Sequence, residues 1–289
     1  MNSTQTSNRL DLPKVIAITG KLPVAPMILG QITSMLSDGN TNLDSIAELI
    51  NQETSLAAQT LRIANSALYG FRTPATTIEE AVLRTGIREI QRLVGLASST
   101  VILNSSHEIY RTTAEFVWEH SVMTAIAMKH IATRGIGDPS VAYTVGLIRP
   151  LGRILISLHV KNARLDVRFE PGTKSVPEWE REEFGVTYAE VGAAACENWR
   201  FPKQIGSALK YHLEPVSHPE AGALSHMLNL ACHVATMLGR GLPGEENLFS
   251  DNPDRFRKTG ALPEDIEDIV DGTILEFDRT KTLLSLLRS

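Results

Sequence analysis

Cysteine and aromatic residues are scarce in this sequence of 289 residues. The two cysteines, Cys196 and Cys232, are too few for a disulfide framework and lack the paired spacing of a zinc site. Aromatic residues make up 6% of the chain, whereas apolar residues (43%) and charged residues (21%) are close to average globular usage. Fibrous, collagen-like and disordered chains are therefore excluded. The composition fits a globular protein of the reducing cytosol.

An excess of positive charge is also missing. The chain has 28 Lys and Arg against 33 Asp and Glu, a formal net charge of −5. Because no positive field favours a polyphosphate, nucleic acid is not expected as a partner. Uninterrupted apolar runs are absent too: the N-terminus is polar, and residues 145–160 are interrupted by Arg149, Pro150 and Arg153. We therefore expect a soluble, cytoplasmic protein without membrane contact.

The pattern that remains is helical almost throughout. Apolar residues recur at helical spacings, and no sustained period-two alternation appears, so the predicted fold class is all-α. Thr77 and Glu80 have the spacing of a capping box, and Asp138-Pro139 is a further helix start. Pro150 predicts a kink or break in the helix expected over 141–160. Residues 239–260 are rich in Gly, Pro and Asp and predict a mobile loop.

Several segments go beyond generic helix. The first is Leu61–Gly70, which reads LRIANSALYG. The others follow in order: Leu22-Pro23 before it, then Ile78–Val82, Gly86, Phe116–Ser121, Gly146–Arg153, Glu180–Gly185, Tyr188–Ala193, Trp199, Phe201-Pro202 and Tyr211-His212. With these segments, residues 14–240 resemble HDOD domains, the HD-related output domains of bacterial signalling proteins.

The resemblance implies a two-lobed helical architecture in which the second lobe is similar to HD phosphohydrolases. Residues 1–13 are then a polar N-terminal tail, and residues 14–108 form the N-terminal helical lobe. Residues 109–240 form the HD-like lobe. Residues 241–289 form a loop followed by C-terminal helices that pack on the HD-like lobe.

The HD resemblance also implies a site. True HD enzymes hold divalent metals with a first His, a His-Asp doublet, further His residues and a late Asp, and the metals activate water against phosphate esters. In this chain His120 and His212 match two His positions, but the doublet has become Arg149-Pro150, another His position is Tyr188, and the late Asp maps approximately to Cys232. Arginine stays protonated and repels a dication. The resemblance therefore implies a degenerate site with no metal, no cofactor and no catalysis.

Arg149 requires a partner, because its apolar neighbours indicate burial. A buried guanidinium either pairs with a carboxylate, such as Glu119 or Glu190, or binds an anionic ligand, and we favour the ion pair. The imidazoles of His120 and His212 are also explained as hydrogen-bonded core groups. Four residues form the predicted vestigial site, which is open to a small anion: His120, Arg149, Tyr188 and His212.

The LRIANSALYG segment supplies a second group of candidates, Asn65, Ser66 and Tyr69. Asn and Ser readily hydrogen-bond to the backbone, and Tyr can anchor the turn at Gly70, which favours a structural role. The alternative is an interlobe or partner-facing surface.

Three functions remain open. The leading hypothesis is a non-catalytic regulatory module of bacterial signal transduction, which binds a kinase, a response regulator or a cyclic-di-nucleotide enzyme, or holds a small anion. The alternative is a metal-dependent phosphohydrolase with a rearranged site that uses His120, His212 and carboxylates not identified from the sequence. A nucleic-acid-binding regulator would need a basic face hidden by the acidic total.

Overall fold

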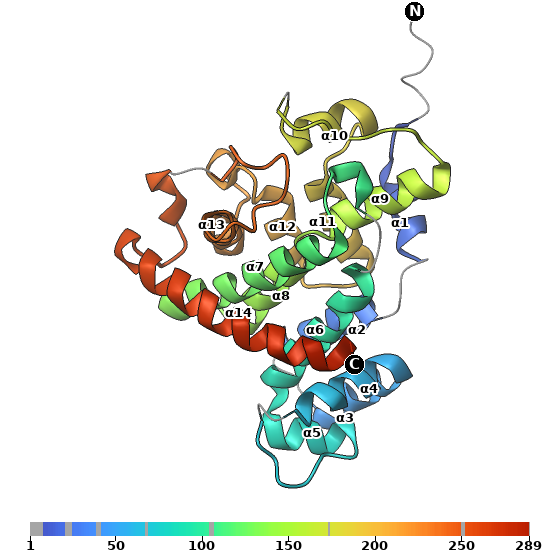
Figure 1. Cartoon of the computed structure of the whole chain (residues 1–289), viewed down its shortest axis with the longest axis vertical. Helices are drawn as coiled ribbons and strands as arrows, with labels where there is room; N and C mark the ends of the chain where they lie inside the picture. The colour runs from blue at the N-terminus through green and yellow to red at the C-terminus, as the bar shows by residue number, and fades with distance from the viewer. Residues whose placement is uncertain are drawn as a thin grey trace, which may run out of the picture.

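A computed structural model describes residues 8–20, 25–38, 42–66, 69–103, 107–172, 174–249 and 252–288. The described residues form helices and connecting segments with no strand among them, which confirms the predicted all-α fold (Figure 1). Residues 1–7 of the predicted tail and the Leu22-Pro23 pair lie outside the described residues. The helices are α1 (Leu12–Thr19), α2 (Ala25–Ser37), α3 (Leu43–Asn51), α4 (Thr54–Ala64), α5 (Ile78–Thr85), α6 (Ile87–Leu103), α7 (Ala114–Arg134), α8 (Pro139–Ile148), α9 (Leu151–Ala163), α10 (Val176–Phe184), α11 (Tyr188–Asn198), α12 (Lys203–Tyr211), α13 (Ala223–Met237) and α14 (Ile266–Arg288), with short 3₁₀ turns η1 (Glu108–Tyr110), η2 (Pro215–Ser217), η3 (Pro253–Phe256) and η4 (Pro263–Asp265).

The core is built around α7, α8 and α9. Arg149 and Pro150 form the turn that separates α8 from α9, so the break predicted at Pro150 is observed. Two glycines let neighbouring helices approach this turn closely. A Cβ added to Gly146 would lie 2.6 Å from the Cα of Ala125 in α7, and one added to Gly152 would lie 1.8 Å from the carbonyl oxygen of Tyr188 in α11. Any larger residue would push these helices apart.

The stretch Pro139–Ala163, which spans α8 and α9, is also the one described segment long and apolar enough to cross a membrane. However, 94% of its most apolar window is buried inside the protein. Buried core helices of soluble proteins can be equally long and apolar, so the segment is consistent with a soluble domain.

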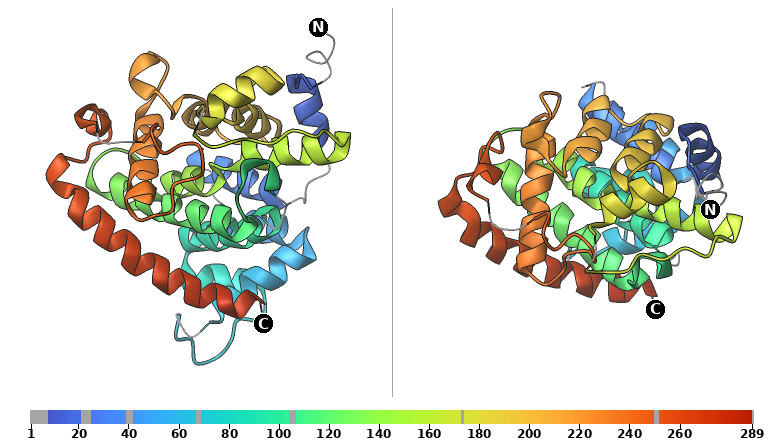
Figure 2. Two further views of the ribbon diagram at one scale, coloured as in Figure 1. Left: turned by 45° about the horizontal axis from the view of Figure 1, so that its top comes forward. Right: turned by 90° about the horizontal axis from the view of Figure 1, so that it is seen from above.

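The helices of the predicted N-terminal lobe lie in two different parts of the molecule. Helices α3, α4 and α5 gather at one end of the molecule, and α6 connects them to α7 and α8 (Figures 1 and 2). Thr77 caps α5, because its Oγ1 accepts a hydrogen bond from the Glu80 amide at 3.2 Å. The predicted capping box is not formed, because the Glu80 carboxylate accepts from the Thr76 amide at 2.8 Å and not from Thr77. In contrast, α1 packs on α9 and α11, so the first helix of the predicted N-terminal lobe lies against the HD-like lobe.

The C-terminal segment contacts both parts of the molecule. Helix α14 packs along α7, as Figure 2 shows, and also reaches α4. Residues 239–260, predicted as a mobile loop, contain the buried side chains of Leu242, Glu245 and Phe249. The middle of this segment is therefore part of the core.

Candidate functional site

The Arg149 side chain stands at the centre of a buried polar cluster. Its Nη1 lies 2.8 Å from the Nε2 of His120 in α7, and its Nε donates to the Nε2 of His212, just after α12, at 3.3 Å. Its Nη2 donates to the Tyr188 hydroxyl, at the start of α11, at 2.9 Å. Arg149 is 1% exposed. The structure therefore brings the four residues of the predicted vestigial site into direct contact, with the guanidinium between the other three side chains.

A carboxylate that sequence reasoning missed completes the cluster. Glu245 accepts from Arg149 Nη2 at 2.5 Å and from Arg153 Nη2 at 2.6 Å, one arginine on each oxygen. The Arg149 and Glu245 side chains are 0% and 1% exposed, so the pair is fully desolvated. The predicted ion pair of Arg149 thus exists, but its partner lies in the segment that was expected to be mobile.

The prediction that Glu119 or Glu190 pairs with Arg149 was wrong. Glu119 lies next to His120, but successive residues on a helix face different directions, and its oxygens bind Arg240 at 2.8 Å and Lys281 at 2.7 Å. Glu190 turns back onto its own helix start, where it accepts from the Thr187 amide at 2.8 Å as part of a capping box.

The imidazoles are held in one tautomer by the backbone. His120 Nδ1 lies 2.6 Å from the Arg240 carbonyl oxygen, and His212 Nδ1 lies 2.7 Å from the Leu209 carbonyl oxygen. Because a carbonyl oxygen only accepts, each Nδ1 carries the proton and each Nε2 presents a lone pair to Arg149. Burial, reinforced by the charge of Arg149, lowers the pKa of both imidazoles to about 3, so both are neutral near pH 7.

The charges of the cluster stabilise each other. Burial alone would raise the pKa of Glu245, but Arg149 and Arg153 hold it well below its usual range. Burial alone would lower the pKa of Arg149, but its neighbours, Glu245 among them, raise it above its usual value. The guanidinium carbon of Arg149 also lies 5.4 Å from the ring centres of Tyr188 and Phe249. The cluster is therefore a permanently charged, closed unit.

Arg153 extends this unit toward α10. It donates to the Pro243 carbonyl oxygen at 3.2 Å and stacks over the Tyr110 ring at 4.9 Å. Next to it, Glu180 accepts from the Tyr110 hydroxyl and the Tyr188 amide, both at 2.6 Å. Burial raises the pKa of Glu180 to about 8, although Arg153 opposes the shift. Sequence reasoning missed this extension, although Arg153 lies four residues after Arg149 on the same apolar run and so carried a signal.

These residues do not fit a divalent metal while Arg149 is in place. Within the part of the chain that the structure describes, no group of three His, Cys, Asp or Glu is placed to hold a metal ion. The lone pairs of His120 and His212, which a metal would need, are directed at the Arg149 guanidinium. Cys232, at the position of the late Asp, is fully buried, and burial raises its pKa to about 12, so its thiol keeps the proton. The two imidazoles therefore bind the Arg149 guanidinium and leave no room for a metal ion between them.

The second group of candidates makes contacts inside the N-terminal part. The side-chain amide of Asn65 donates to the Ala75 carbonyl oxygen at 2.8 Å and accepts from the Ala75 amide at 2.7 Å. Tyr69 donates to Glu89 and accepts from Arg92 at 3.2 Å. Ser66 is buried, and its hydroxyl has no hydrogen-bond partner among the described residues. A role for these residues in binding a partner stays a prediction.

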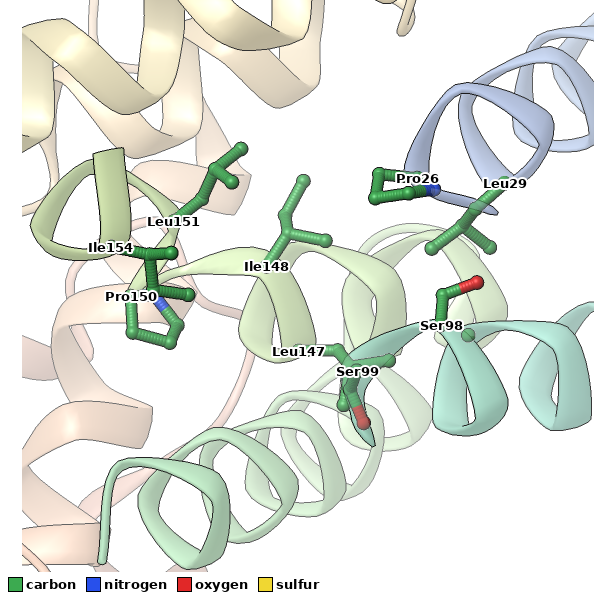
Figure 3. Close-up of a pocket in the computed structure, with 10 residues that line it drawn as sticks. Pro26, Leu29, Ser98, Ser99, Leu147, Ile148, Pro150, Leu151 and Ile154 are labelled. Atoms are coloured by element: carbon green, nitrogen blue, oxygen red, sulfur yellow. The ribbon is translucent and has the colours of Figure 1, made fainter. Parts of the chain in front are cut away.

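A separate apolar pocket lies beside the Arg149 turn, where α2 and α6 meet α8 and α9 (Figure 3). Pro26 and Leu29 face Ile148 and Leu151 across it. Its polar groups are already engaged, since the Ser99 hydroxyl donates to the Leu96 carbonyl oxygen at 2.8 Å and accepts from Trp118 at 3.2 Å. The residues that line it carry no charge, so the Arg149 cluster remains the better candidate for function.

Solved structures with the same fold come from several bacteria. An HDOD domain protein of unknown function from Geobacter sulfurreducens has a TM-score of 0.64 and 22% identity, covering 92% of this chain and 97% of that one. A putative phosphohydrolase from Shewanella amazonensis SB2B has a TM-score of 0.64 and 20% identity, covering 93% and 97%. A putative signal transduction protein from Marinobacter aquaeolei VT8 has a TM-score of 0.71 and 19% identity, covering 99% and 64%.

Sequence comparison leads to the family. An uncharacterized protein of Treponema pallidum (strain Nichols) is 24% identical over 204 residues, which cover 69% of this chain but 39% of that protein. The chain thus spans about two fifths of the curated relative that it matches. The family model for the HDOD domain matches residues 22–215. Because this match covers more than half of the chain, it shows that the chain belongs to the HDOD domain family.

Proposed function

We propose that this protein is a non-catalytic regulatory module of signal transduction that acts in the cytoplasm by binding a signalling protein. Family membership and the structural likeness to a putative signal transduction protein support the signalling role. The partner classes we propose are a sensor kinase, a response regulator and a cyclic-di-nucleotide enzyme.

The observation that carries the non-catalytic part is the position of Arg149. In an HD-type hydrolase the metal polarises a water and the phosphate ester. Here the guanidinium lies between the two imidazoles, has no exchangeable coordination site and stays protonated at any physiological pH. The buried cluster therefore supports a role in stability in place of hydrolysis.

The same geometry bears on the proposed small-anion ligand. Glu245 already supplies the anion that Arg149 and Arg153 require, and all three side chains are buried. A small anion bound at the Arg149 cluster would have to displace this carboxylate. We therefore favour a protein partner, bound elsewhere on the molecule, as the ligand of this protein.

Two measurements on the full chain test the proposal. The first is turnover of phosphomonoesters, phosphodiesters and cyclic dinucleotides with added Mn²⁺ or Mg²⁺, for which we expect no activity above buffer. The second is a pairwise binding screen against the sensor kinases, response regulators and cyclic-di-nucleotide enzymes of the same cell, for which we expect a specific complex. Metal-dependent turnover would overturn the proposal in favour of the phosphohydrolase alternative, and an empty screen would overturn the signalling partner.

A further inference from the structure

We propose that the groove between α11 and α12 is a docking site for an amphipathic helix of a partner protein, and that the acidic flank of that helix faces α12. The inference rests on the proposed function, because it states where the signalling partner binds and what chemistry it presents. No residue of the Arg149 cluster lines this groove.

The first argument is the shape of the groove. It has a volume of about 580 Å³ and lies where α11 packs against α12. Small side chains line its middle, because Ala193 and Ala194 come from α11 and Gly206 from α12, and all three residues are partly exposed. Small residues at a contact allow two helices to approach to about 8 Å, the short end of the usual interaxial range. The surface therefore accommodates a helix.

The second argument is the charge along α12. Lys203 and Lys210 both line the groove, and their spacing of seven residues places them on one face of the helix, about 10.5 Å apart along its axis. Both residues are exposed, and neither makes an ion pair with a described residue. The Lys210 ammonium contacts the Tyr211 ring, at 5.1 Å from its centre. Two carboxylates seven residues apart on a partner helix would match both lysines.

The third argument is the N-terminus of α12, where Lys203 is the first residue. Pro202 precedes it and makes no side-chain capping hydrogen bond, and the first turn contains no acidic residue. The N-terminal end of a helix has positive character, so a lysine there does not help the helix to form. A carboxylate from outside would interact favourably with both the lysine and the helix end.

The opposite side of the groove is acidic and restricts the choice of partner. Glu190 and Glu197 line it from α11, again seven residues apart. Arg181 binds Glu190 at 2.9 Å, whereas Glu197 is exposed and makes no ion pair with a described residue. A helix that is acidic on both flanks would be repelled by Glu197. The groove therefore fits a helix with a single acidic flank, which faces α12.

The experiment uses the full chain and two synthetic helical peptides of about four turns, each held by a lactam bridge on its outer face. Both have the same apolar stripe, but one has two Glu seven residues apart on one flank and the other has Lys there. We expect fluorescence anisotropy to show that the wild type binds the acidic peptide about tenfold more tightly. The net charge of −5 favours the opposite order, so this preference has to come from a local surface.

Charge-reversal variants assign the preference to the groove. Lys203→Glu combined with Lys210→Glu should reverse the order of the two peptides. Lys161→Glu combined with Arg168→Glu makes the same change in net charge outside the groove and should leave the order unchanged. All four residues are exposed, so we expect these variants to fold like the wild type.

A steric variant tests the shape argument. Ala194→Phe places a large side chain in the groove and should weaken the acidic peptide by at least about tenfold. Gln204→Phe is the matched control, since Gln204 is exposed on α12 and does not line the groove, and it should bind like the wild type.

Failure of the groove can be distinguished from failure of the proposed function. The groove is refuted if the wild type binds neither peptide, or if Lys203→Glu with Lys210→Glu keeps the order of the wild type. Self-association in sedimentation that the same double variant abolishes would assign the groove to a second copy of this chain instead. Metal-dependent turnover would refute the proposed function alone and leave the peptide titrations to decide the groove.

Discussion

Arg149 and Glu245, 96 residues apart in the chain, form a fully buried ion pair with 2.5 Å between Nη2 and Oε2. The pair joins the α8–α9 turn to a segment without regular secondary structure and includes Arg153 through the second carboxylate oxygen. One buried carboxylate therefore pairs with two buried arginines.

Removing the carboxylate should destabilise the protein strongly. Glu245→Ala leaves two buried guanidinium groups without their shared anion, and we expect a loss of about 3–5 kcal/mol in the free energy of unfolding. Urea denaturation measures it. The matched control is Glu170→Ala, which breaks the surface pair with Arg111, whose side chains are 65% and 45% exposed, and should cost less than about 1 kcal/mol. Similar losses for both variants would contradict the assignment.

Stability should fall when the solution is acidified below pH 6.5. The folded-state pKa is about 3 for His120 and His212 and about 4 for His107, all lowered mainly by burial, against about 6.5 in an unfolded chain. The unfolded state binds these protons first, so their contribution is complete above pH 6.5 and is lost as the pH falls toward the folded values. Each imidazole contributes a slope of up to about 1.4 kcal/mol per pH unit. Glu180 contributes a slope of opposite sign between its unfolded-state pKa and its folded-state pKa of about 8, so it offsets part of the loss.

Denaturation at a series of pH values from 7 to 5 measures this slope. In His212→Gln the slope should decrease by up to about 1.4 kcal/mol per pH unit, most fully near pH 5, because one of the three imidazoles no longer titrates. An unfolding free energy that stays constant over this range would show that the imidazoles are not shielded from protons in the folded protein.

Gly152→Ala should separate α9 from α11. Its Cβ would lie 1.8 Å from the Tyr188 carbonyl oxygen, which is backbone and cannot rotate away. We expect a loss of about 1–3 kcal/mol or more by thermal or chemical denaturation. Gly20→Ala is the control, since the nearest atom would be 3.7 Å from its Cβ, and it should change stability by less than about 0.5 kcal/mol. Equal effects of the two variants would show that the close approach at Gly152 is not required.

Tyr69→Phe distinguishes the two roles of the LRIANSALYG segment. The hydroxyl donates to Glu89 and accepts from Arg92, so its loss should cost about 1 kcal/mol of stability if its role is structural. The binding of a signalling partner should then be unchanged, as measured by calorimetry. Unchanged stability together with lost binding would assign Tyr69 to the partner surface instead.

Local chemistry in the sequence determined much of the fold. Helical periodicity predicted the all-α class, Thr77 and Asp138 predicted helix starts, and Pro150 predicted the break that places Arg149 between α8 and α9. These features depend on residues within one or two turns of each other, so the sequence suffices to predict them. Family motifs additionally grouped His120, Arg149, Tyr188 and His212, although nothing in their spacing alone places them in contact.

Only the tertiary structure decided which carboxylate meets Arg149. Glu119 and Glu190 are both nearer to Arg149 in the sequence than Glu245 is. However, Glu119 lies on another face of α7 and pairs with Arg240, and Glu190 caps the start of its own helix. Glu245 lies in a Gly- and Pro-containing segment with no periodicity, and it reaches the core because two buried arginines require an anion there. A long-range ion pair of this kind depends on the global chain path and on burial, neither of which a local pattern records.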